Sequence, residues 1–137
     1  MTAVREAIRL RLLATPQVSN ITEVIRPGVL QLNDKPPAVL VRVIGDSPQE
    51  WLNTNERTHK ARIAVQAYGA DVTKADTLAE MIRTYALYPL LKGNVHGCDI
   101  REVSLEVGPF EQQDQPKDGS DDWMRSVRQD FMVIYNQ

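Results

Sequence analysis

The sequence predicts an α+β fold, with about four strands in a mostly antiparallel sheet packed by two helices in the order α-β-β-α-β-β. Two segments repeat apolar residues at helical spacing, and four have the β-branched or alternating pattern of strands. The strands come in two successive pairs with polar connections between them, which favours two antiparallel hairpins. A chain of 137 residues suits one domain, so we expect a single domain over 1–137.

The first predicted helix covers residues 3–14, where the apolar positions form a broad arc, and Pro16 stops it. Arg11 falls inside this apolar arc. Its side chain either extends to water along the apolar surface or meets an acidic partner at a subunit contact.

The first predicted strand, 38–44, is apolar on both faces except at Arg42, which indicates a central strand or one covered on both sides. The second, 58–68, alternates apolar residues with polar ones that include Lys60 and Arg62. Together with Arg42 these two would form a small basic stripe, either solvated or facing another subunit. Apart from Tyr68, the stripe has no interleaved aromatic side chains on which nucleic-acid bases could stack.

The second predicted helix, 72–88, has one apolar and one polar face, and Asp71 or Thr73 can cap its N-terminus. Beyond it, alternation predicts a third strand around 103–107. A long last strand runs over 123–135.

Two long polar loops, 45–57 and 111–122, join the strands of the predicted hairpins. The first carries Trp51 and Leu52, and such large apolar side chains in a polar loop often mark a partner site. The loops either contact other chains or fold back onto the sheet.

Composition excludes several classes of protein. The net charge of −2, from 16 basic and 18 acidic residues, gives no general electrostatic reason to bind nucleic acid or an anionic membrane. No segment approaches the roughly 20 apolar residues that span a bilayer, and the charged N-terminus is unlike a signal peptide. The single cysteine, Cys98, rules out an internal disulfide. We therefore expect a protein made in a cytosol.

The sequence carries no recognisable catalytic, cofactor-binding or metal-binding motif. His96 and Cys98 are close together, but the only other histidine is His59 and there is no second cysteine for a closed zinc site. Phosphate-binding glycine motifs and the nucleophile-elbow motif are missing as well. We predict that the protein is not an enzyme and uses no cofactor or metal. The alternative is a small enzyme or ligand-binding domain that uses these three residues.

Four segments together resemble one family. They are the helix end with its proline stop, the Ile-Arg-Pro-Gly turn followed by a Pro-Ala-Val strand start, the strand that leads into the second helix, and the terminal strand, at 12–18, 25–28 with 37–39, 62–87 and 130–135. In their order and spacing, the sequence resembles the tail completion, or tail terminator, family of long-tailed phages and prophages, in the form of a siphophage-type neck protein.

This resemblance implies a structural subunit that forms a ring, usually a hexamer, on the head-proximal end of the tail tube. The implied partners are further copies of the chain, the tail tube protein and a head–tail connector or stopper protein. DNA could pass through the ring without specific binding, and no membrane is involved. The implied location is the neck region of a virion tail, assembled in the cytoplasm of a bacterial host. The alternative is another head–tail joining or tail-tube subunit.

The predicted subunit or partner interface combines the apolar pair of the 45–57 loop, the basic stripe, and apolar surface that an isolated monomer does not need. This surface lies on both faces of the 38–44 strand and around the first helix. A ring needs two different, matching patches on each subunit. We assign Arg11, Arg42, Trp51, Leu52 and Arg62 to such contacts.

Overall fold

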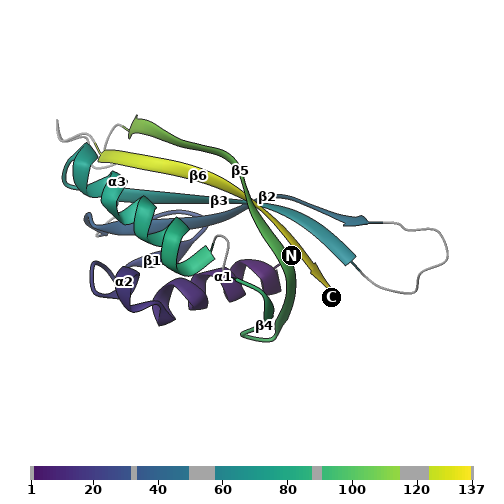
Figure 1. Cartoon of the computed structure of the whole chain (residues 1–137). Coiled ribbons are helices and arrows are strands. Elements are labelled where there is room, and N and C mark those ends of the chain that lie inside the picture. Colours follow the sequence, from purple (N-terminus) through teal and green to yellow (C-terminus); the bar gives the residue numbers. More distant parts are fainter. Residues whose placement is uncertain (1, 32–33, 50–57, 88–90, 115–123, 137) are drawn as a thin grey trace.

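The computed structural model describes residues 2–31, 34–49, 58–87, 91–114 and 124–136. In this part of the chain six strands form one curled, half-barrel sheet in the order β1-β2-β3-β6-β5-β4 (Figure 1). The strands are β1 Ile25–Pro27, β2 Ala38–Gln49, β3 Thr58–Gly69, β4 Gly93–Val95, β5 Cys98–Asp114 and β6 Met124–Asn136. Because β1 runs parallel to β2 while the other pairs are antiparallel, the sheet is mixed.

The predicted fold class is therefore wrong. The sheet has six strands rather than four, and there are about three short helices rather than two. The strands β1 and β4 have three residues each, too short to leave a periodic signal in the sequence. They form because the chain on either side brings them against the longer strands β2 and β5.

The helices lie against one face of the sheet (Figure 1). They are α1 Thr2–Ala14, α2 Pro16–Ser19 and α3 Val72–Met81, which continues as the π-helix η1 Ile82–Leu87. Pro16 ends α1 as predicted but also begins α2, because proline is tolerated at the first helical position. The side chain of Asp71 caps α3 by accepting a hydrogen bond of 2.8 Å from the backbone N–H of Lys74. None of the described helices is long and apolar enough to cross a membrane.

The main core fills the space between the helices and the sheet. Alternate residues of β3 point into it, as the sequence predicts, and meet Phe131 of β6 and apolar side chains of α1 and α3. The β3 residues are Ala61, Ile63, Val65 and Ala67.

The start of β2 is covered on both faces, as predicted, but within the chain itself. Val39 and Val41 belong to the main core. On the opposite face Leu40 packs with Tyr68 under the preceding segment, which contributes Val24 and Leu30. Self-association is therefore not needed to cover this part of the strand.

Both hairpins are longer than the sequence predicts. Strand β2 continues to Gln49 and β5 continues to Asp114, so each includes part of a predicted loop. The β2–β3 hairpin extends beyond the helices (Figure 1). The predicted partner residues Trp51 and Leu52 lie outside the described residues.

Candidate interaction surface

The sheet face that carries no helix is called the outer face here. Side chains alternate along each strand, so residues between the core positions of β3 and β6 point to this face. The pairing register sets Arg42 of β2, Ala64 of β3, Asp130 of β6 and Val107 of β5 in one row across the sheet. The outer face is therefore built from strands that are far apart in the sequence.

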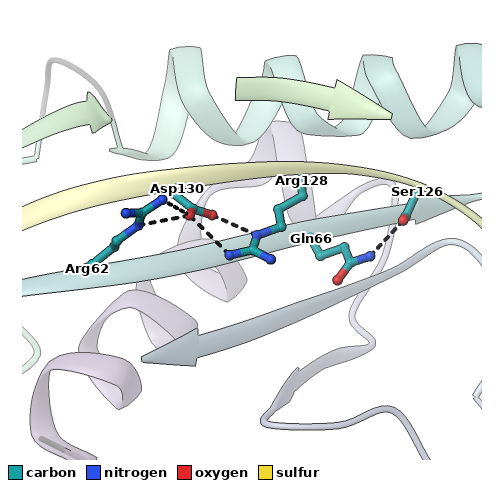
Figure 2. Close-up of polar contacts among 5 residues, drawn as sticks. All are labelled: Arg62, Gln66, Ser126, Arg128 and Asp130. Atoms are coloured by element: carbon teal, nitrogen blue, oxygen red, sulfur yellow. Dashed lines mark hydrogen bonds and ion pairs between the residues drawn. The ribbon is translucent and has the colours of Figure 1, made fainter. Parts of the chain in front are cut away.

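Asp130 lies at the centre of the outer face between two arginines (Figure 2). Arg62 donates to Oδ2 from Nε at 3.0 Å and from Nη2 at 2.8 Å. Arg128 donates from Nε to Oδ1 at 2.8 Å and from Nη2 to Oδ2 at 3.1 Å. The Asp130 side chain is only 1% exposed, whereas those of Arg62 and Arg128 are 40% and 21% exposed. A buried carboxylate is thus held by two partly hydrated cations.

Two opposing effects set the pKa of Asp130. Burial raises it, because a low-dielectric site disfavours the charged form. The hydrogen bonds and positive charges of Arg128 and Arg62 lower it further than burial raises it, so the pKa lies below its usual value. Asp130 is therefore a carboxylate at neutral pH, and its charge orients both guanidinium groups.

The surroundings of this cluster are polar on one side and aromatic on the other. Gln66 donates from Nε2 to the hydroxyl of Ser126 at 2.7 Å, one row along the sheet (Figure 2). The guanidinium carbon of Arg128 lies 5.7 Å from the centre of the Phe110 ring, within reach of a cation–π interaction.

Arg42 gives the outer face a third guanidinium. Its Nε is buried, and no acceptor for it is found among the described residues. The same holds for the Nε atoms of Arg5 and Arg83, which lie on helices. Both Asp130 oxygens already accept hydrogen bonds from other arginines. Among the described residues, Arg62 and Arg128 therefore share the Asp130 carboxylate, while the Nε of Arg42 has no acceptor.

The predicted interface residues are only partly brought together. Arg42 and Arg62 share the outer face, as the predicted basic stripe requires. Arg11 lies elsewhere, on α1, where its Nε donates to the backbone oxygen of Ala86 at 3.1 Å and links α1 to η1. Trp51 and Leu52 are outside the described residues.

A second polar cluster lies on the helix side of the sheet, toward the loop end of the β2–β3 hairpin. The carboxylate of Asp46 accepts a hydrogen bond from the Tyr135 hydroxyl and lies 3.1 Å from Nδ1 of His59. The rings of His59 and Tyr135 are stacked, with centres 5.3 Å apart. Burial, together with the neighbouring Asp46 carboxylate, raises the pKa of Tyr135 well above its usual value. Sequence reasoning missed this cluster and the role of Asp130.

The residues considered for metal binding or catalysis are separated. His96 is exposed in the turn between β4 and β5, whereas Cys98 is buried in the main core, where burial raises its pKa. His59 belongs to the Asp46 cluster. Across the described ranges no group of three or more His, Cys, Asp or Glu side chains is placed to hold a metal ion.

Comparison with known proteins supports the fold. No protein-family model and no curated protein matches the sequence. Among solved structures, a chain from the "Virion of native gene transfer agent (GTA) particle" is similar, with a TM-score of 0.60 and 13% sequence identity. The alignment covers 99% of this chain and 96% of that chain. At this identity the likeness establishes a shared fold over nearly the full length of both chains.

Proposed function

We propose that this protein is a structural subunit of a phage-like particle and that it acts by presenting surfaces, without catalytic turnover. The observation that carries the proposal is the near-complete overlap in fold with a chain of a gene transfer agent virion. That chain belongs to a virion particle, so it is a component of an assembly.

Within such a particle, the proposed role is that of a tail terminator. Copies of the chain form a ring, usually a hexamer, on the head-proximal end of the tail tube, end its polymerisation and join it to the head connector or stopper protein. The location is then the neck region of the virion. This finer assignment depends on the sequence resemblance to the tail terminator family, and the full-length overlap in fold is compatible with it.

The outer face suits a protein that works by contact. Arginine is enriched at protein–protein interfaces because its planar group pairs with carboxylates and stacks on aromatic rings. Here Arg62 and Arg128 are preorganised by Asp130, so they lose little side-chain freedom when a partner binds.

Deletion of the gene in a strain that makes the particle, followed by electron microscopy, tests the role. A terminator's loss leaves tubes of uncontrolled length that are not joined to heads, and the wild-type gene supplied in trans restores normal tails. Loss of all tubes would instead indicate a tube subunit. Tails of normal length without heads would indicate a joining protein. Unchanged particles would contradict the proposal.

A further inference from the structure

The two long edges of the sheet carry different side chains. Strand β1 pairs with β2 only at 39–41, and β4 pairs with β5 only at 98–100. Over the part of the chain that the structure describes, β2 from Arg42 onward and β5 from Arg101 onward therefore have no strand beyond them. These two stretches are called the β2 edge and the β5 edge.

Both edges are interrupted by β-bulges, and an apolar side chain is exposed at each interruption. On the β2 edge the register shifts between Val43 and Gly45, and Ile44 between them is 48% exposed. On the β5 edge register shifts lie on both sides of Val107, which is 38% exposed. Bulges twist an edge and hinder its extension by a further strand. A partner therefore contacts each edge through side chains rather than through backbone hydrogen bonds of an added strand.

The charged residue beside each register shift has the opposite sign: Arg42 on the β2 edge and Glu106 on the β5 edge. Beside Ile44, Arg42 has a buried Nε with no acceptor among the described residues, and the Asp130 carboxylate is already taken by other arginines. A desolvated donor without an acceptor is unfavourable, so Arg42 gains from a carboxylate supplied from outside. Beside Val107, Glu106 is exposed, and no cation lies within ion-pair distance of it in the described ranges.

We propose that the β2 edge of one copy binds the β5 edge of the next copy, with Arg42 pairing with Glu106 and Ile44 packing against Val107. The occupant of the β2 edge is thus a second copy of this chain, because the second edge supplies both the missing charge and an apolar residue. Since the two edges differ, the contact is head-to-tail and closes into a ring when its rotation allows. The inference depends on the proposed ring function and names the surfaces that form the ring.

Complementary charge reversals test this contact. In every contact Arg42→Glu sets two carboxylates against each other, and Glu106→Lys sets two cations against each other. Each variant alone should therefore assemble at least about tenfold more weakly than wild type. An equimolar mixture of the two variants should regain assembly. In a ring of alternating copies, each contact then joins either the two native residues or the two reversed ones.

Assembly is measured by sedimentation velocity over a concentration series and by co-sedimentation with tail tubes from a strain that lacks the gene. Lys74→Glu and Glu80→Lys change the same charges at exposed positions of α3 and serve as matched controls that should assemble like wild type. Because Glu106 is exposed, Glu106→Lys carries the test even if Arg42→Glu does not fold.

The outcomes separate this inference from the proposed function. The edge contact is overturned if the variants assemble like the controls, or if the mixture does not regain assembly. In either case the proposed function stands as long as the wild-type chain forms a ring. A wild-type chain that neither self-associates nor binds tubes would overturn both.

Discussion

Replacement of Asp130 by asparagine tests how the outer face is held. Asparagine keeps the shape of the side chain and one acceptor oxygen but removes the charge that Arg62 and Arg128 share. Two guanidinium groups then stay close together without a counter-charge. We expect Asp130→Asn to lower the free energy of unfolding.

The size of the loss follows from the exposure of the three side chains. Removing one partner of a fully buried ion pair costs about 3–5 kcal/mol, and an exposed pair contributes about 0–1 kcal/mol. Asp130 is 1% exposed, but the arginines it leaves behind are 40% and 21% exposed and stay partly hydrated. We therefore expect a loss of about 2–3 kcal/mol, between these limits. For a domain of this size that corresponds to a drop in Tm of roughly 10 °C.

The stability loss of Asp130→Asn should depend on pH. Because the arginines hold the pKa of Asp130 below its unfolded value of about 3.9, its stabilisation is fully present above about pH 4 and is lost as pH falls through the folded pKa. The stability difference between wild type and Asp130→Asn should therefore shrink below about pH 4. Urea denaturation followed by circular dichroism over a pH series measures it.

An exposed carboxylate provides the control. Asp76 lies on the solvent side of α3, and Asp76→Asn should stay within about 0.5 kcal/mol of wild type at neutral pH. If Asp130→Asn behaves like Asp76→Asn, or if its deficit is the same at every pH, the Asp130 cluster does not stabilise the sheet and the reasoning fails.

Two further substitutions test the Asp46 cluster and the strand–helix junction. A Cβ on Gly69 would lie 2.4 Å from the backbone nitrogen of Ala75, so Gly69→Ala should cost about 2 kcal/mol in urea denaturation. Gly45→Ala, with nothing within 4 Å of the added Cβ, should be nearly neutral, and equal losses would refute the close approach. Burial and Asp46 raise the pKa of Tyr135, so the stability it provides is present below about pH 10 and is lost as pH rises above that value. Asp46→Asn should lower this pKa, seen as phenolate absorbance at lower pH, and an unchanged titration would contradict the role of Asp46.

The sequence by itself determined where the long elements lie, but not how far β2 and β5 extend. Helical periodicity, with Asp71 or Thr73 as the candidate cap, located α3 with its continuation η1, and alternation located the core face of β3. These signals are local, because a helix or a long strand repeats its apolar positions within a few residues. The same alternation put Arg42 and Arg62 on one face of the sheet, which is the part of the candidate surface that sequence reasoning found.

Only the tertiary structure decided the sheet order and the chemistry of its outer face. Strand β6 lies between β3 and β5, and this brings Asp130 to Arg62 although 68 positions separate them. No local pattern records which strand becomes a neighbour, because that choice depends on the whole sheet and on the core beneath it. The short strands β1 and β4 likewise exist only through their pairing with β2 and β5, since three residues carry no periodic signal of their own.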